Sequence, residues 1–300
     1  IPKDVVMKIG IYGQFYHKNS ETHIQAILNA LQSKGVEIVV EKNFLALMRE
    51  NQSFHTDLSK LASFTKLDTS YDLFFSIGGD GTILKSITFV RDLDIPIVGV
   101  NTGRLGFLAT IQKQDVTSSI TEILEGNYYI SERSLLSIET SPSNKEITPL
   151  NFALNEVAVN RKNTTSMIKV ETTINSEYLT SYWSDGLIVS TPTGSTGYSL
   201  SCGGPVIEPS NESIILTPIA PHNLNVRPLV VPDNSVVTLK VSGREDTHLV
   251  SLDSRIVTLE NETLITIKKA AFTIKFVQPI EESFIKTLRK KLLWGEDKRN

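Results

Sequence analysis

The residues with the clearest capacity for chemistry form one short passage, Gly78-Gly79-Asp80-Gly81-Thr82. An apolar run at 73–77, typical of a buried strand, precedes it, and a run at 83–90, typical of a helix, follows it. Glycines in such a turn let the backbone approach a ligand, and the first N–H groups of the helix favour an anion such as phosphate. Asp80 would then accept a proton from a hydroxyl that attacks the phosphate, or help to hold a bound metal. The alternative is a tight turn in which Asp80 lies near the helix N-cap.

A second glycine-containing passage, at 101–108, follows another apolar strand at 95–100. Its side chains Asn101 and Arg104 suit phosphate or ribose oxygens, so the passage would line a ligand beside the first loop. The alternative is an interdomain turn whose apolar residues dock on the core.

A polar pair, Asn155 and Glu156, interrupts an apolar strand at 152–159. Adjacent strand residues point to opposite faces, so one of the two should face inward and need a partner. An amide beside a carboxylate suits the two hydroxyls of a ribose. An edge-strand pair that faces solvent is the alternative.

The longest unusual passage is 184–199, in which hydroxyl residues and two glycines gather at 190–197, directly after a strand. Such a loop would surround the polar edge of a planar ligand, and Tyr198 would stack on its ring. The alternative is a flexible surface loop. The sequence has no Gly-x-Ser-x-Gly elbow, no Gly-x-x-x-x-Gly-Lys-Ser/Thr phosphate loop and no Gly-x-Gly-x-x-Gly motif.

The elements that must position these passages fall into two patterns. Apolar strands at 5–12, 36–40, 72–77 and 95–100 alternate with helical patterns such as 22–34, which predicts a mostly parallel sheet covered by helices. From about 134 to 277 short strands such as 264–268 and 272–276 predict an all-β, sandwich-like domain. The expected domains are an α/β domain at 1–108 and a β-rich, dinucleotide-binding domain at 109–280. Ligands of parallel sheets lie beyond the carboxyl ends of the strands, where 78–82 falls.

The composition narrows the class of protein. A chain of 300 residues with 40% hydrophobic and 21% charged residues is typical of a globular protein with a substantial core. A net charge of −3 argues against nucleic acid or an acidic membrane as partner. The single cysteine, Cys202, fits a reducing, cytoplasmic compartment, and no apolar stretch approaches the roughly 20 residues that span a bilayer.

Together these passages resemble the NAD kinase family over essentially the whole chain. The resemblance is carried by the motifs at 78–82, 101–108, 155–156, 184–201, 203–205, 221–224 and 293–295. The first loop also occurs in diacylglycerol kinases and related lipid kinases, whereas the Thr-Pro-Thr-Gly-Ser-Thr run is specific. Gly197 stands where the family usually has Ala, and Trp183 stands where many relatives have Arg or another polar residue.

The resemblance implies transfer of the γ-phosphoryl group of ATP to the 2′-hydroxyl of the adenosine ribose of NAD, with Mg²⁺ or another divalent ion. By motif position, Asp80 would be the general base. The implied phosphate and ATP contacts are Gly78, Gly79, Thr82, Asn101 and Arg104. The implied NAD contacts are Gly81, Asn155, Glu156, Asp185, Thr191, Thr196, Gly197, Tyr198 and Ser199.

The resemblance also implies a helix at 281–300 that packs back on the first domain, and a homodimer or homotetramer. Two other functions remain open from the sequence. One is a lipid kinase of the diacylglycerol kinase type, and the other is a non-catalytic dinucleotide sensor.

Overall fold

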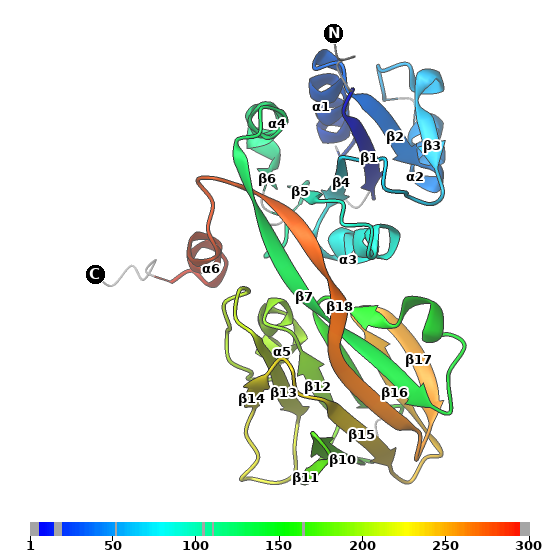
Figure 1. The fold of residues 1–300 in the computed structure, drawn as a ribbon, viewed down its shortest axis with the longest axis vertical. Helices are drawn as coiled ribbons and strands as arrows, with labels where there is room; N and C mark the ends of the chain where they lie inside the picture. Colours follow the sequence, from blue (N-terminus) through cyan, green and yellow to red (C-terminus); the bar gives the residue numbers. More distant parts are fainter. Residues whose placement is uncertain are drawn as a thin grey trace. The chain divides into compact units, whose positions relative to one another are not determined.

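The chain divides into two compact units in the computed structural model, which describes residues 6–14, 20–51, 53–103, 106–109, 111–163 and 166–294. Unit 1 comprises 1–132 and 274–300, and unit 2 comprises 133–273. The boundaries fall within two long strands, β7 (Tyr128–Ser141) and β18 (Leu264–Pro279) (Figure 1). No helix of the described residues is long and apolar enough to cross a membrane.

Unit 1 is built on a parallel sheet in the order β3-β2-β1-β4-β5, continued by the end of β18 through the pair Phe276 and Ile97. Its other strands are β1 (Lys8–Gly13), β2 (Glu37–Glu41), β3 (Ala62–Phe64), β4 (Leu73–Gly78), β5 (Ile97–Asn101) and β6 (Ile111–Gln112). Its helices are α1 (Ser20–Ser33), α2 (Lys42–Glu50), α3 (Asp80–Val90), α4 (Val116–Leu124) and α6 (Phe284–Leu292).

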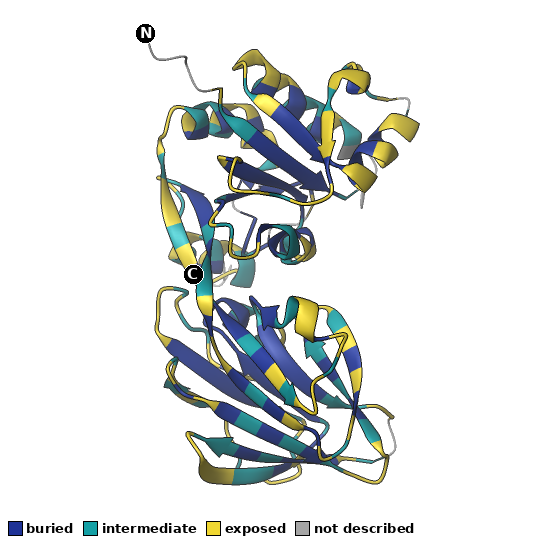
Figure 2. Ribbon diagram, turned by 45° about the vertical axis from the view of Figure 1, so that its right-hand side comes forward, coloured by how far each residue is buried: buried dark blue, intermediate teal, exposed yellow. Residues whose placement is uncertain are grey.

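Helices cover this sheet, as its continuous apolar strands predict. Every residue of β4 and β5 is buried, which is typical of a parallel sheet covered on both faces (Figure 2). The ring of Tyr12 lies 6.4 Å from that of Phe44 in α2 and 5.1 Å from that of Phe89 in α3. Lys291, at the end of α6, lies over the ring of Phe107 at 5.7 Å, so within unit 1 the last helix packs on the passage that follows β5.

Unit 2 is a sandwich of two antiparallel sheets. One sheet has the order β14-β13-β12-β9-β16-β17, and the other contains β11-β10-β15 and the first part of β18. Their strands are β9 (Glu156–Arg161), β10 (Ile168–Ile174), β11 (Glu177–Ser184), β12 (Gly186–Ser190), β13 (Ser213–Ile219), β14 (Leu229–Pro232), β15 (Val237–Ser242), β16 (Thr247–Leu252) and β17 (Arg255–Glu260). The short strand β8 (Phe152–Ala153) pairs with β7.

The core of unit 2 lies between these sheets. Val237, Leu239 and Val241 alternate with partly exposed residues along β15, and they join Val157 and Val189 of the other sheet in one apolar cluster. The strand β12 is buried on both faces, because the turn η4 (Thr193–Thr196) and the short helix α5 (Tyr198–Ser201) also contact it.

The expected fold class is therefore confirmed, but two local predictions were wrong and one helix was missed. The strands expected at 264–268 and 272–276 are one strand, β18, because its two halves pair with different partners, β15 and β5. The passage expected as a loop at 191–199 contains η4 and the start of α5. The helix α2 was not anticipated.

Candidate active site

The turn from β4 into α3 is open at its glycines. Gly79 is the N-cap residue of α3, and a Cβ atom on Gly79 or Gly81 would have no neighbouring atom within 4 Å. Gly78 has φ +157°, and a Cβ atom there would lie 2.2 Å from Thr82 Oγ1, so only glycine fits. The first N–H groups of a helix have no partner within it, so this turn offers donors and a partial positive charge to an anion.

The predicted phosphate contacts Thr82 and Asn101 lie beside this turn but are buried. Thr82 Oγ1 donates to Gln14 Oε1 at 3.2 Å, so this hydroxyl braces the turn from within. Asn101 is the partner of Gly78 in the β4–β5 ladder, and its Oδ1 accepts the Gly103 N–H at 2.8 Å. Arg104 lies outside the described residues.

Asp80 begins α3, and its carboxylate holds the passage that follows β5. Oδ2 accepts the Phe107 N–H at 2.7 Å, and Oδ1 accepts those of Leu108 at 3.1 Å and Ala109 at 3.3 Å. A Cβ atom on Gly106 would lie 1.9 Å from Asp80 Oδ1, so the passage reaches the carboxylate only because this residue is glycine. The structure thus brings the two glycine-containing passages of unit 1 together through Asp80.

In unit 2, Asn155 and Glu156 converge on Gly197. A Cβ atom on Gly197 would lie 3.4 Å from Glu156 Oε2 and 3.7 Å from Asn155 Nδ2. Burial raises the pKa of Glu156 to about 8, the charge of Asp253 adds to the rise, and the Tyr198 backbone N–H opposes it. Glu156 Oε2 is buried without a hydrogen-bond partner among the described residues. A neutral Glu156 thus presents an unpaired polar atom beside an amide.

Tyr198 contacts this pair through its backbone N–H, which bonds to Glu156, whereas Asp185 lies at the other end of the β9–β12 ladder, where Gly186 pairs with Asn160. The Tyr198 side chain is 40% exposed, and its hydroxyl donates to Asn160 Oδ1 at 3.5 Å. Burial is the chief cause that raises the pKa of Tyr198. Asp185 Oδ2 is 2.9 Å from Arg161 Nη2, and this ion pair fixes its carboxylate. An exposed aromatic ring beside fixed polar groups suits a planar ligand.

The hydroxyls of Thr191, Thr196 and Ser199 brace the protein itself. Thr191 Oγ1 donates to Leu154 O at 2.6 Å, Thr196 Oγ1 donates to Thr193 O at 3.2 Å, and Ser199 Oγ pairs with Thr217 Oγ1 at 2.8 Å. The Thr191 N–H also donates to Asn155 O at 2.9 Å. These three residues therefore shape the turn around Asn155 through internal bonds.

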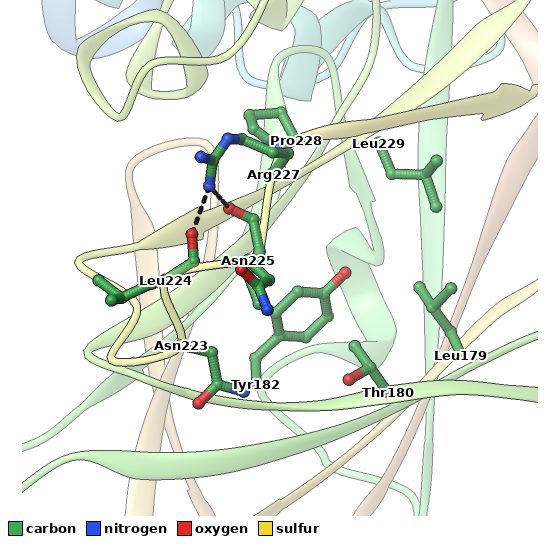
Figure 3. A pocket seen from close by; sticks show the side chains of 10 residues that line it. Leu179, Thr180, Tyr182, Asn223, Leu224, Asn225, Arg227, Pro228 and Leu229 are labelled. Carbon is green, nitrogen blue, oxygen red and sulfur yellow. Dashed lines mark hydrogen bonds between the residues drawn. The ribbon is translucent and has the colours of Figure 1, made fainter.

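A separate groove of about 730 Å³ lies elsewhere on unit 2 and contains none of the predicted site residues (Figure 3). Asn223 and Leu224 of the motif at 221–224 line it, beside Tyr182. The Arg227 guanidinium donates to the carbonyl oxygens of Leu224 and Val226 at 2.7 Å each, so this arginine stabilises the conformation of its own loop.

Sequence reasoning missed Asp253, in the turn between β16 and β17. Its side chain is 2% exposed, and it accepts the N–H groups of Leu154, Asn155 and Glu156. The only signal was an acid in a two-residue turn, which usually indicates an exposed side chain. Among the described residues, no three His, Cys, Asp or Glu side chains are grouped so that they could hold a metal ion.

The ATP-NAD kinase N-terminal domain matches residues 9–128, and the ATP-NAD kinase C-terminal domain matches residues 154–279. These two matches, one on the α/β unit and one on the β-sandwich, define the class of protein as a kinase of the NAD kinase type. The chain belongs to the NAD kinase family.

Named relatives and solved structures agree with this assignment. The chain is 60% identical to an NAD kinase of Christiangramia forsetii over 98% of this chain and 100% of the relative. It is 53% identical to an NAD kinase of Flavobacterium psychrophilum over the same shares. An Archaeoglobus fulgidus NAD kinase solved in complex with ATP is 26% identical, with a TM-score of 0.74 over 96% of this chain and 99% of that chain. Yeast NADH kinase complexed with NADH shares the fold at 24% identity, with a TM-score of 0.85 over 98% of this chain and 89% of that chain. None of these favours a lipid kinase or a sensor.

Proposed function

We propose that this protein is an NAD kinase that transfers the γ-phosphoryl group of ATP to the 2′-hydroxyl of the adenosine ribose of NAD, giving NADP. Full-length similarity to NAD kinases supports this reaction. The observation that carries it in the structure is the open glycine turn at the start of α3, with Asp80 as its first helical residue. This turn combines an anion site with a proton acceptor, as phosphoryl transfer to a hydroxyl requires.

In this proposal the N-terminal turn of α3 binds phosphate oxygens of ATP. Gly79 and Gly81 leave room for them, while Gly78, Thr82 and Asn101 maintain the shape of the turn. An anion at a helix N-terminus is stabilised by the unpaired N–H groups and by the helix dipole. The complex of the Archaeoglobus fulgidus relative with ATP supports ATP as the donor.

Asp80 acts as the general base through Oδ2. This oxygen accepts only the Phe107 N–H among the bonds described, whereas Oδ1 accepts two amides. A carboxylate oxygen has two lone pairs, so Oδ2 can accept the ribose hydroxyl without releasing Phe107. As the 2′-oxygen bonds to the γ-phosphorus, the bond from that phosphorus to the β,γ-bridging oxygen breaks and ADP leaves, while the hydroxyl proton passes to Asp80 Oδ2.

Unit 2 holds the dinucleotide. Asn155 and a protonated Glu156 donate to ribose oxygens near Gly197, and the exposed ring of Tyr198 stacks on a base. Asp185, held by Arg161, accepts from an amino group of the ligand. Thr191, Thr196 and Ser199 contribute by holding the turn in shape.

Mg²⁺ enters with ATP as part of the substrate. The ion prefers phosphate oxygens and usually takes only one or two carboxylates from a protein. When bound, it neutralises phosphate charge. Its requirement is tested by titrating EDTA into the assay with ATP and NAD.

We also place the protein in the cytoplasm as a homodimer or homotetramer. The single cysteine fits a reducing compartment. Tyr178 and Trp183 are 60% and 46% exposed on the edge strand β11, where apolar side chains favour contact with another copy. Light scattering after size exclusion measures the oligomer, and a monomer at micromolar concentration would contradict this assembly.

One assay tests the reaction and its alternatives. Purified protein with MgATP and NAD is expected to form NADP and ADP in equal amounts. A dinucleotide sensor would bind NAD without forming ADP, and a lipid kinase would phosphorylate diacylglycerol in vesicles instead. Absence of NADP with any triphosphate or polyphosphate donor would refute the proposed function.

A further inference from the structure

A buried carboxylate outside the predicted site, that of Asp253, is bonded to the backbone of the Asn155–Glu156 turn. Oδ2 accepts the Leu154 N–H at 3.0 Å, and Oδ1 accepts those of Asn155 at 2.8 Å and Glu156 at 3.3 Å. The Asp253 backbone N–H returns a fourth bond to Glu156 O at 2.9 Å. One turn residue thus holds three successive amides about 100 positions away in the sequence.

The turn around Asn155 is also held from its carbonyl side. Thr191 Oγ1 donates to Leu154 O at 2.6 Å, and the Thr191 N–H donates to Asn155 O at 2.9 Å. A Cβ atom on Gly194 would lie 2.0 Å from Asn155 O, so this side admits no larger residue. Thr191 therefore bonds the carbonyl groups of this turn, and Asp253 bonds its N–H groups.

The turn geometry explains a short polar residue at this position but not the burial of its carboxylate. Asp253 has φ +53°, a left-handed conformation in which aspartate, asparagine and glycine are all enriched. A carboxylate with 2% exposure also costs free energy unless it is compensated. The compensation comes from the three amides and from Arg255, whose Nη2 lies 3.9 Å from Asp253 Oδ2. Arg255 also donates to Leu150 O at 2.6 Å and to Phe152 O, so it fixes the chain that leads into the turn.

We propose that Asp253 is a positioning residue for the dinucleotide, which holds the backbone of 154–156 so that the Asn155 and Glu156 side chains meet at Gly197. The inference rests on the proposed function of that pair. Asp253 does not act on the reacting atoms. Its negative charge also raises the pKa of Glu156, so it favours the protonated Glu156 that donates to the ligand.

Asp253→Asn tests the role without breaking the turn, because asparagine tolerates a positive φ. We expect KM for NAD to rise at least tenfold, with KM for ATP changed less than threefold. We also expect the pH midpoint of NAD binding to fall, because Glu156 loses a neighbouring charge. If Asp253 had a merely structural role, Asp253→Asn would lower the melting temperature and weaken the affinities for NAD and ATP together, without moving the pH midpoint of NAD binding.

Glu262→Gln is the matched control. Glu262 is another carboxylate at a left-handed turn position of unit 2, with φ +64°, but its side chain is 59% exposed and pairs with Lys240. This variant should match the wild type in both KM values. A folded Asp253→Asn variant with unchanged KM for NAD and an unchanged pH midpoint would overturn this inference and leave the proposed function in place.

Hydrogen exchange of the wild type keeps the inference testable if Asp253→Asn does not fold. We expect the amides of 154–156 to be protected before NAD is added, with little further change on binding. Amides that become protected only after NAD is added would contradict positioning by Asp253. A wild type that neither binds NAD nor forms NADP would overturn the proposed function and this inference together.

Discussion

The Glu156→Gln variant should gain unfolding free energy relative to the wild type as the pH rises. The folded-state pKa of Glu156 is about 8, against 4.5 for an ordinary glutamate, and the chief cause is burial. Because the folded value is raised, the stability from the neutral carboxyl is fully present below pH 4.5. It is lost as the pH rises through about 8. Glutamine keeps the neutral shape and does not titrate.

The magnitude follows from the two pKa values. One pH unit of difference corresponds to about 1.4 kcal/mol, so ionising Glu156 in the folded protein costs on the order of 5 kcal/mol. Between pH 5 and pH 8 the wild type should therefore lose roughly 3 to 4 kcal/mol of unfolding free energy relative to Glu156→Gln. Any constant effect of the substitution, such as a changed bond to Tyr198, cancels when the same pair of proteins is compared across pH.

Urea unfolding at half-unit steps from pH 5 to pH 8 measures this difference. The buried groups Asp253, whose pKa is raised by burial, and His248, whose pKa is lowered by burial, titrate in both proteins. Glu139→Gln is the control, because Glu139 is an exposed carboxylate of β7 paired with Lys268 at 2.8 Å. The reasoning would be refuted if the difference in unfolding free energy between the wild type and Glu156→Gln stayed constant from pH 5 to pH 8 within about 0.5 kcal/mol, a typical uncertainty for such comparisons.

Other substitutions test separate contacts. Asp80→Asn should retain the fold and lower kcat by at least a hundredfold in the NADP assay, a typical size for loss of a general base, and near-normal turnover would exclude that role. Gly106→Ala should lower kcat at least tenfold, because its Cβ atom would lie 1.9 Å from Asp80 Oδ1; kinetics within twofold of the wild type would show that the loop can move aside. Gly197→Ala should stay within threefold of wild-type activity, because φ is −98° and the nearest atom would be 3.3 Å away. Burial lowers the pKa of His248 below 6.5, so its neutral form is favoured in the folded protein and the wild type loses stability as the pH falls from 6.5 to 5. The melting temperature of His248→Leu should therefore fall less than that of the wild type over this range.

Much of the fold was predictable because burial imposes regular patterns on the sequence. The apolar runs that became β4 and β5 are continuous, since helices cover both faces of a parallel sheet. The length of β18 was not predictable from its own residues. Lys268 and Lys269 suggest a break, yet the backbone continues because separate strands pair with each half.

The candidate site was predictable in residue type and less so in side-chain direction. Hydroxyl residues at 191–199 suggest ligand contacts, yet those of Thr191 and Ser199 point into the protein and bond there. A hydroxyl serves a ligand or a backbone carbonyl equally well, so composition cannot distinguish them. The role of Asp253 could not be predicted from the sequence for a related reason. Its role depends on amides that only the fold brings to it.

The carboxylates of Asp80 and Asp253 show that an acid in this fold can hold backbone amides without acting as a base. Asp80 holds the amides of 107–109, and Asp253 holds those of 154–156, so each fixes three successive N–H groups of a distant passage. Loss of activity in Asp80→Asn therefore has two sources, a missing proton acceptor and a displaced loop. Gly106→Ala separates them, because it displaces the loop while the carboxylate remains. If Asp80 is the base, Asp80→Asn must cost far more in kcat than Gly106→Ala; equal losses would assign Asp80 to positioning alone.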